Sequence, residues 1–591
     1  MTQTPGPYGG YIGGITIPET SNTLSHPEGP EYSFTVGEGV YTLRESIQLA
    51  TPPPHPSEPL HTNNSALTAA APPQSPGTRL SLVQIKTRTP SPVALTTRGG
   101  VDDAGSRTSA DTDENSSSGG GVIPRNNNNN NGDLVFGAGN ASLSSASGKG
   151  AKQGNKKARG NLAKSNSTFV SRIAVCDGLQ KRLGERDQEE LMVFANINRA
   201  FNWLDMGSAA KQEPLSRILF TRAHPTCHDV NQLTRSTSHL DVVVGFPSGD
   251  IIWFDAITNK YARINKNGVI NPHSVTAIHW LPNSETLFLV AHSDGSLIVY
   301  DKDKDDEPFL PSSSRPSSAT STPPTFFRVL KSVTHTPQKT NPISYYTLTP
   351  HSPTSLSFSP SGTHLAVTSE DMCLRLLHFP KERLTDVFTS YYGGLTCAAW
   401  SPDGKYIITG GQDDLVSIWS VEERRIVARC AGHHSWVTGV AWDPWAGEIG
   451  EGVYRFGSVG ADQRLLLWDF SLGGLFVPKN SSSHGNTYTN PTHRNSISST
   501  APRSRSNTTS SLHPPHPHPP PPGLDDDLPL IHPVEERARC AVLPPIMSKE
   551  IDPDPLTQIV FREEGIVTAC VAGHVRVWER PGKSEGGGRK R

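Results

Sequence analysis

A repeated segment is the strongest constraint on the fold of this chain. Short β-prone segments that end in an aromatic residue or a leucine recur seven times along the sequence. Four of the six steps between them are 42–50 residues long, and the other two, of 77 and 110 residues, contain polar tracts. Periods of this length are typical of β-propellers, in which each blade packs mainly on its neighbours, so the sequence predicts seven blades. The matched positions are Leu204, Phe254, Tyr300, Leu377, Trp419, Trp468 and Trp578.

The pattern inside one repeat is that of β-strands. Residues 393–420 contain three short alternating segments that are separated by Ser-Pro-Asp-Gly and by Gln-Asp-Asp-Leu. Proline and glycine interrupt the chain too often for long helices, and they suit the turns between strands. We therefore expect an all-β protein.

Several tracts are too polar to fold. Only 34% of the residues are hydrophobic, whereas globular chains usually contain roughly 45–50% when glycine is counted too. Segments rich in Ser, Pro, Asn and Gly cannot bury enough apolar surface to offset their conformational entropy, so we expect them to be disordered. The predicted organisation is a disordered N-terminus (1–27), N-terminal propeller strands (28–90) with a disordered insert at 46–78, a disordered linker (91–165), and a propeller (166–591) with disordered inserts at 302–325 and 472–535.

The last blade has no fourth strand of its own. After residues 574–578 the chain continues as a short Gly- and Lys-rich tail. Because an unpaired edge is a liability for a sheet, we expect an N-terminal strand to close the ring. Two segments qualify, 31–45 and 79–88, and residues 537–543 are predicted to be the outer strand of the sixth blade.

The sixth blade resembles a complete WD40 repeat. It contains His433, Ser458, Asp462 and Trp468 at the spacing of that family, in which these groups form a hydrogen-bonded chain inside the blade. The fifth blade has Thr409, Asp413 and Trp419 at the same offsets, with Tyr391 in the place of the histidine. The resemblance implies a structural role for all seven positions, and we predict no catalytic residue.

Charge and composition exclude several other classes of function. The net charge is −2, so the chain has no overall field for a nucleic acid. The N-terminus does not look like a signal peptide, and no apolar run approaches the roughly 20 residues that span a membrane. Seven dispersed cysteines suggest reduced thiols, so we expect an intracellular protein, cytoplasmic with nuclear entry left open, and no metal or cofactor.

Loops of the second and third blades contain residue types that are typical of binding surfaces. Phe246 lies in a tight turn, and a nearby connection contains Tyr261, Arg263, Asn265 and Lys266. Aromatic residues and arginine are enriched at binding hot spots, so we predict partner contacts here. The alternative is that Phe246 packs on its own blade and that Arg263 is a solvated charge.

A longer resemblance points to a partner. Residues 201–282 resemble the CreC family of fungal catabolite repression proteins and the animal WD-repeat cofactors of ubiquitin-specific proteases. The resemblance implies a seven-bladed WD40 β-propeller that acts as a scaffold for a CreB-like deubiquitinating enzyme in carbon catabolite repression. A substrate receptor of a ubiquitin ligase is the alternative, although Trp468-Asp469-Phe470-Ser471 lacks the Arg of the Trp-Asp-x-Arg motif found in some receptors. The sequence leaves the oligomeric state open.

Overall fold

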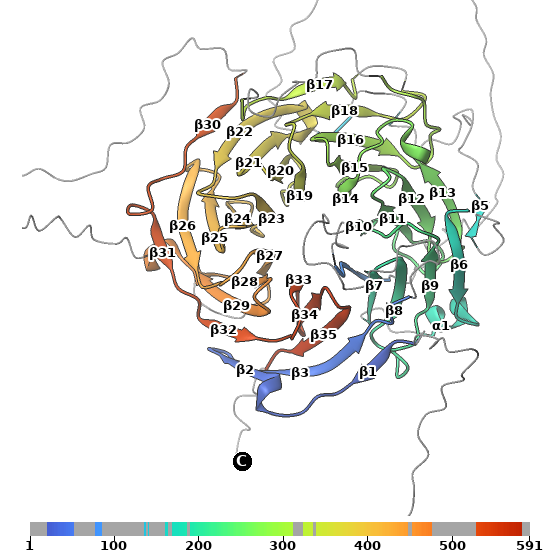
Figure 1. The fold of residues 1–591 in the computed structure, drawn as a ribbon, viewed down its shortest axis with the longest axis horizontal. Helices are drawn as coiled ribbons and strands as arrows, with labels where there is room; N and C mark the ends of the chain where they lie inside the picture. The colour runs from blue at the N-terminus through green and yellow to red at the C-terminus, as the bar shows by residue number, and fades with distance from the viewer. Residues whose placement is uncertain are drawn as a thin grey trace, which may run out of the picture.

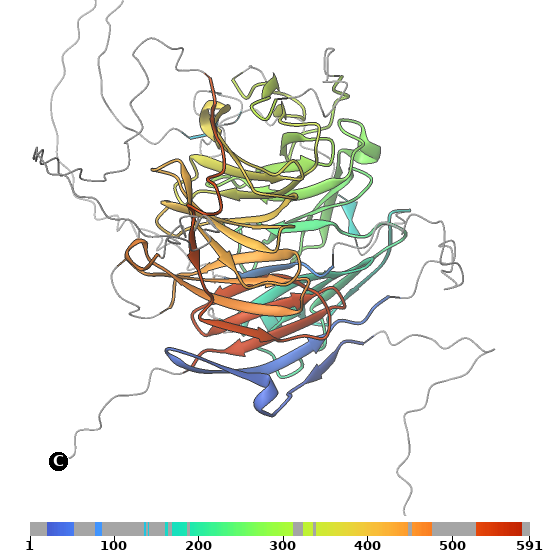
Figure 2. The ribbon, with the colours of Figure 1, turned by 60° about the vertical axis from the view of Figure 1, so that its left-hand side comes forward.

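Seven twisted sheets surround a central axis, as Figure 1 shows. In the side view of Figure 2, further strands lie along the outer edge of the ring. The prediction of an all-β, seven-bladed propeller is therefore confirmed. The computed structural model describes residues 21–52, 77–85, 135–137, 140, 143, 160–162, 168–185, 190–310, 323–334, 338–446, 452–475 and 528–581.

Blades one to three follow one another along the chain, and each has five strands ordered from the axis outward. Blade one contains β4 (Leu80–Gln84), β7 (Leu191–Ile197), β8 (Ala200–Asp205), β9 (Ser216–Phe220) and β6 (Val170–Val175). Blade two contains β10 (Cys227–Val230), β11 (Asp241–Gly245), β12 (Ile251–Asp255), β13 (Lys260–Ile264) and β5 (Gly160–Asn161). Blade three contains β14 (Val275–Trp280), β15 (Leu287–His292), β16 (Ser296–Asp301), β18 (Ser344–Thr347) and β17 (Arg328–Lys331).

Blades four to seven complete the ring. Blade four contains β19 (Pro353–Phe358), β20 (His364–Ser369), β21 (Cys373–His378), β22 (Arg383–Thr389) and β30 (Leu530–His532). Blade five contains β23 (Leu395–Trp400), β24 (Tyr406–Gly411), β25 (Leu415–Ser420), β26 (Arg425–Ala431) and β31 (Ala541–Leu543). Blade six contains β27 (Val437–Asp443), β28 (Tyr454–Gly460), β29 (Arg464–Phe470) and β32 (Met547–Glu550). Blade seven contains β33 (Leu556–Arg562), β34 (Gly565–Cys570), β35 (His574–Glu579), β3 (Gly39–Gln48), β1 (Thr23–Ser25) and β2 (Ser33–Val36).

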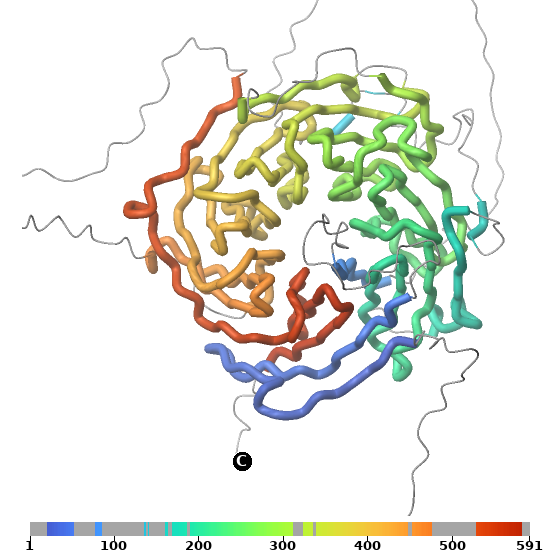
Figure 3. The backbone as a smooth tube through the Cα atoms, in the orientation of Figure 1, coloured from blue at the N-terminus to red at the C-terminus, as the bar shows by residue number. Residues whose placement is uncertain are grey.

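An N-terminal strand closes the ring, as predicted. Strand β3 pairs antiparallel with β35, so that Leu43 lies opposite Trp578 and Ile47 opposite Val575. Figure 3 shows this contact as the blue N-terminal segment beside the red C-terminal one. The second candidate segment, 79–88, has a different place: its strand β4 is the innermost strand of blade one. The N-terminal region therefore completes two neighbouring blades, seven and one.

The outer strands of blades four to six correct another expectation. Strand β31 pairs in parallel with β26 of blade five, so the assignment of residues 537–543 to blade six is wrong. The outer strand of blade six is β32, which pairs antiparallel with β29. Residues 530–550 thus follow the outside of three successive blades (Figure 1), and this route could not be read from a strand count.

Some residues inside the tracts expected to be disordered have defined partners. Strand β5 pairs with β13, and Phe136 stacks on Phe379 with ring centroids 4.7 Å apart. Lys302, the first residue of the range 302–325, is buried against Asp241. Strand β30 lies in the range 472–535 and adds to blade four. Local composition could not reveal these contacts, because each partner lies far away in the sequence.

The core is a series of apolar layers between neighbouring blades. Trp253, Trp419, Trp468 and Trp578 are almost completely buried between the sheets. Helical structure is sparse: α1 (Leu179–Gly184) and the short turns η1 (Pro30–Tyr32), η3 (Lys266–Gly268), η5 (Phe379–Lys381) and η6 (Leu472–Gly474). Within the described ranges, no helix has both the length and the apolar character needed to span a bilayer.

Candidate partner-binding surface

One face of the ring carries two kinds of loop. In an antiparallel blade, the turn between the second and third strands and the connection to the next blade must lie at the same end of the strands. We call this end the upper face. In several blades a polar pair joins the incoming connection to the turn of the blade that follows it, as Asn271 Nδ2 does with Asp294 Oδ2 at 3.2 Å.

Blade six has the complete polar chain that its sequence predicts. The Nδ1 atom of His433 lies 3.0 Å from Asp462 Oδ2, and its Nε2 atom lies 2.8 Å from Ser458 Oγ. The indole Nε1 of Trp468 donates to the same Ser458 Oγ at 2.9 Å. Contact with His433 lowers the pKa of the Asp462 carboxyl, although burial opposes that shift. The chain fixes the connection from blade five onto the turn of blade six.

Blade five has half of this chain. Trp419 Nε1 donates to Thr409 Oγ1 at 2.9 Å, as in blade six. At the histidine position, Tyr391 lies under the guanidinium group of Arg537, and within the described part of the chain no hydrogen bond joins it to Asp413. The Oδ2 atom of Asp413 is buried and has no hydrogen-bond partner among the described residues, and burial raises the pKa of this carboxyl. Of the predicted hydrogen-bonded chain, blade five therefore forms the bond between Trp419 and Thr409 but not the part that would include Asp413 Oδ2.

Blade seven contains a pair that the sequence analysis missed. Trp578 Nε1 donates to Thr568 Oγ1 at 3.3 Å. Thr568 precedes Trp578 by the same ten residues that separate Ser458 from Trp468, so this spacing was a usable signal.

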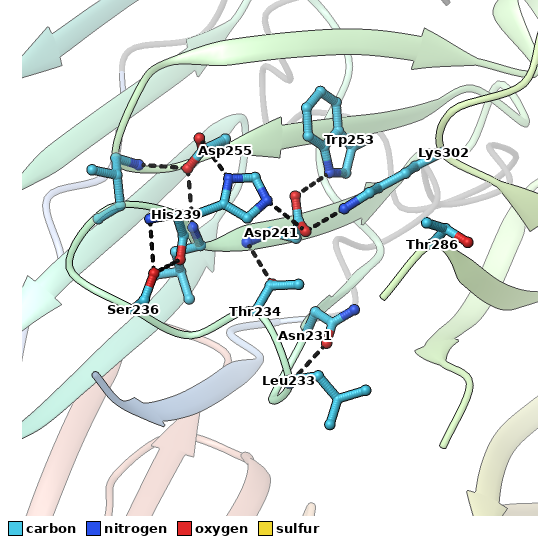
Figure 4. Close-up of polar contacts among 12 residues, drawn as sticks. Asn231, Leu233, Thr234, Ser236, His239, Asp241, Trp253, Asp255, Thr286 and Lys302 are labelled. Carbon is cyan, nitrogen blue, oxygen red and sulfur yellow. Dashed lines mark hydrogen bonds and ion pairs between the residues drawn. The ribbon is translucent and has the colours of Figure 1, made fainter. Parts of the chain in front are cut away.

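A buried ionic cluster joins blades two and three on the opposite, lower face, and Figure 4 shows its contacts. His239 bridges two carboxylates, with Nε2 3.0 Å from Asp241 Oδ2 and Nδ1 2.9 Å from Asp255 Oδ2. These hydrogen bonds, that to Asp241 first, raise the pKa of His239 to about 9. Lys302 contacts Asp241, and Trp253 Nε1 donates to Asp241 Oδ1 at 2.7 Å. Because the charged groups satisfy one another and the two carboxylates are buried, this arrangement suits blade-to-blade packing.

Two of the five residues predicted to contact a partner lie inside the protein, which corrects that prediction for them. Phe246 is 0% exposed and packs edge-on against Phe169 and Phe220, with ring centroids 4.9 and 4.7 Å away. Asn265 is also 0% exposed, and its amide donates to Gly249 O at 2.8 Å. Both hold loops in place, because a buried side chain cannot touch a partner without rearrangement.

The other three residues stay nearer the surface. Arg263 pairs with Asp250 at 2.7 Å, and its guanidinium lies 4.5 Å from the centre of the Phe169 ring. Tyr261 is half-buried, and Lys266 is exposed. A partner contact at these three residues stays a prediction.

A different part of the upper face presents apolar side chains to solvent. Tyr392 is 72% exposed, Trp436 is 53% exposed and Met372 is 42% exposed. We call these three residues the aromatic patch. They line a cavity of about 730 Å³ at blades four to six, together with Glu370, Gln412 and neighbouring loop residues. Exposed aromatic residues grouped around a hollow are typical of protein-binding sites.

The loops that carry the aromatic patch are firmly held. The backbone N–H of Ala461 donates to Trp436 O at 2.8 Å, and the backbone N–H of Ser390 donates to Met372 O at 2.8 Å. Next to Tyr392, the N–H of Gly394 donates to Gln412 Oε1 at 2.9 Å, and the N–H of Gln412 returns a bond to Gly394 O at 3.0 Å. His433 lies on the same connection as Trp436 and joins that connection to the polar chain of blade six. These side chains are thus exposed although their backbones are fixed.

The seven blades define a WD-repeat β-propeller, with the Trp–Ser–His–Asp hydrogen bonds complete in blade six and their Trp–Thr part in blades five and seven. The WD40 family (WD domain, G-beta repeat) matches residues 343–377 and 382–420. The chain belongs to the family of the UBP9-binding protein bun62 of Schizosaccharomyces pombe. The two are 38% identical over 418 residues, which cover 70% of this chain and 75% of that protein. A chain of the Crystal Structure of Mitotic Checkpoint Complex aligns over 72% of this chain and 95% of its own length, with 11% identity and a TM-score of 0.40.

Proposed function

We propose that this protein is a non-catalytic scaffold that binds a ubiquitin-specific protease through the aromatic patch. A relative with 38% identity is named for binding UBP9, which supports the class of partner. The proposed location of the protease-binding site rests on one observation: Tyr392 and Trp436 are exposed on hydrogen-bonded loops beside the same cavity.

The physical case for this patch rests on preorganisation. Tyrosine and tryptophan bury a large area for few rotatable bonds, and a handful of such residues supplies most of the affinity of an interface. Ordering a flexible side chain on binding costs about 0.5–1.5 kcal/mol, and fixed loops avoid part of that cost. A protease docked here would therefore gain affinity from residues that need little rearrangement.

The finer proposal concerns the pathway. The resemblance of residues 201–282 to the CreC family supports a CreB-like protease as partner, carbon catabolite repression as the process, and a location inside the cell. The scaffold would stabilise or activate the protease and would need no catalytic group of its own.

A binding titration with matched variants tests the proposal. The full-length protein and a purified CreB-like ubiquitin-specific protease are titrated by calorimetry, and ubiquitin cleavage is measured in parallel. We expect Trp436→Ala and Tyr392→Ala each to cost about 2 kcal/mol or more of binding free energy, a loss of about thirtyfold in affinity, with little change in thermal stability. Trp445→Ala is the control, because Trp445 is 44% exposed and follows β27 on the lower face of blade six.

Three outcomes oppose the proposal. Failure of the wild-type protein to bind the protease would refute the partner. Equal binding by the wild type, Trp436→Ala and Tyr392→Ala would refute the location. Loss of binding in Trp445→Ala alone would move the interface to the lower face.

A further inference from the structure

Four side chains with metal-binding chemistry meet in blade seven, outside the aromatic patch. One ligand atom from each lies within 4.8 Å of the ligand atoms of the other three. They come from the connection that enters blade seven and from the end of β34 and the start of β35. We call them the blade-seven cluster: Asp552, Asp554, Cys570 and His574.

Part of this cluster has a structural explanation. In blade six, His433 on the incoming connection contacts Asp462 in the turn between the second and third strands. In blade seven the aspartate lies on the incoming connection and the histidine lies just after the turn. Asp552 Oδ1 lies 3.1 Å from His574 Nδ1 and takes the place of the histidine–aspartate pair. That pair accounts for two of the four groups, whereas Cys570 and Asp554 are not needed for it.

The ligand types and their spacing favour zinc. A thiolate, an imidazole and carboxylates are all ligands of Zn²⁺, with bonds of about 2.0–2.3 Å in a tetrahedron. Ligand atoms around such an ion lie about 3.3–3.8 Å apart, so groups already within 4.8 Å need shifts of about 1 Å. Ca²⁺ and Mg²⁺ prefer oxygen alone, which a site with sulfur and nitrogen does not supply.

The surroundings suit a bound divalent cation. Asp552 is 4% exposed and Cys570 is 0% exposed, so two of the ligands are shielded from water. Arg576 Nε lies 2.9 Å from Asp552 Oδ2, while Asp552 Oδ1 faces His574 Nδ1 and accepts the backbone N–H of Asp554 at 3.1 Å. The N–H of His574 donates to Cys570 Sγ at 3.3 Å. Two carboxylates and a thiolate carry three negative charges, which Zn²⁺ and Arg576 together would balance.

We infer that the blade-seven cluster binds one Zn²⁺ ion. The ion would tie the connection into blade seven to the start of β35. The closing segment meets the same turn, because the N–H of Leu49 donates to Gly573 O at 3.0 Å and Gln48 Nε2 donates to Ala572 O at 2.6 Å. Zinc at this point stabilises the closure of the ring.

Metal content and a cobalt spectrum test this inference on the full-length protein. The protein is stripped with a chelator, incubated with Zn²⁺ alone, desalted and analysed by mass spectrometry for metal. We expect about one Zn²⁺ per chain, a higher melting temperature with zinc, and a thiolate-to-Co²⁺ charge-transfer absorption when Co²⁺ replaces Zn²⁺. Cys570→Ser and Asp554→Asn each lose the bound metal, and Cys570→Ser also loses the absorption.

Two controls separate this site from other metal-binding groups. Cys430→Ser changes another buried cysteine and retains the metal and the absorption. A variant with His513, His516 and His518 changed to alanine does the same, since these histidines stand in a separate proline-rich tract. Absence of retained zinc in the wild type, or an unchanged cobalt spectrum in a folded Cys570→Ser protein, would overturn the inference, and so would loss of the metal in the histidine variant.

Discussion

Blades two and six both bury a tryptophan whose indole N–H anchors a polar network, but the two networks lie at opposite ends of the blade. In blade two, Trp253 donates to Asp241 in an ionic cluster on the lower face. In blade six, Trp468 donates to Ser458 in a chain that reaches the upper face through His433 and ends at the Asp462 carboxylate. The network of blade six therefore fixes an upper loop, whereas the ionic cluster of blade two fixes a loop on the lower face.

Blade six can leave its upper tryptophan free, because hydrogen bonds already fix the loop. Trp436 is 53% exposed, and the connection that carries it is fastened to Asp462 through His433 and through the N–H of His434 at 2.9 Å. At the upper end of blade two, Asp250 pairs with Arg263 and accepts the N–H of Asn267, and Phe246 turns inward and packs its ring against Phe220. Trp436 is thus available for binding because hydrogen bonds support its loop, whereas the ring of Phe246 is itself part of the packing.

The largest expected effect is the loss of stability caused by a substitution in blade two. Phe246→Ala removes a fully buried ring from contact with Phe169 and Phe220, so it leaves a cavity and should cost about 3–5 kcal/mol of unfolding free energy. Equilibrium denaturation in urea measures this loss. Binding of the protease should stay close to that of the wild type wherever the variant is folded.

Trp436→Ala provides the matched comparison, since its ring is half exposed and should leave the denaturation midpoint nearly unchanged. If Phe246→Ala were as stable as the wild type and bound the protease weakly, blade two would carry the interface after all.

The difference between blades two and six also explains which features could be predicted from the sequence alone. The interval of ten residues between Ser458 and Trp468, or between Thr409 and Trp419, predicted hydrogen bonds that the structure contains. Such spacings are local, and the strands that carry them have regular geometry. The direction of a loop side chain depends on the neighbouring blade, so the sequence could not tell that Phe246 points inward.

The same reasoning applies to the outer strands. Residues 31–45 and 79–88 are the two candidates for closing the ring, because an open edge needs a partner, and β3, which begins in the first of them, does so. The prediction for strand β31 is wrong because it assumed that the chain returns to blade six after the long insert. The chain instead passes the edges of blades four and five first, and there β31 pairs in parallel with β26. Contacts between segments hundreds of residues apart leave no periodic trace.

A smaller effect is expected in blade six. His433→Ala leaves Ser458 Oγ and the Asp462 carboxylate without their buried partner, which should cost about 1–3 kcal/mol of unfolding free energy. The loop that carries Trp436 loses its support, so the affinity for the protease should fall about 2- to 10-fold as the loop must be ordered on binding. Denaturation and calorimetry measure the two effects.

Thr409→Val is the control for His433→Ala, since it deletes the hydroxyl that Trp419 contacts in blade five. It should lower stability without affecting the loop of Trp436. Equal losses of affinity in the two variants would show that general destabilisation, and not loop support, weakens binding.

The smallest effect concerns the ionic cluster of blade two and its dependence on pH. The folded-state pKa of His239 is raised to about 9 by its bonds to Asp241 and Asp255, whereas an unfolded histidine titrates near 6.5. Protonated His239 therefore contributes stability that is complete below pH of about 6.5 and is lost as the pH rises through about 9. Because 37% of the side chain is exposed, the change should be modest. We expect the urea midpoint of the wild type to fall more between pH 6.5 and 9 than that of His239→Gln. Parallel profiles would show that His239 gives blade two no pH-dependent stability.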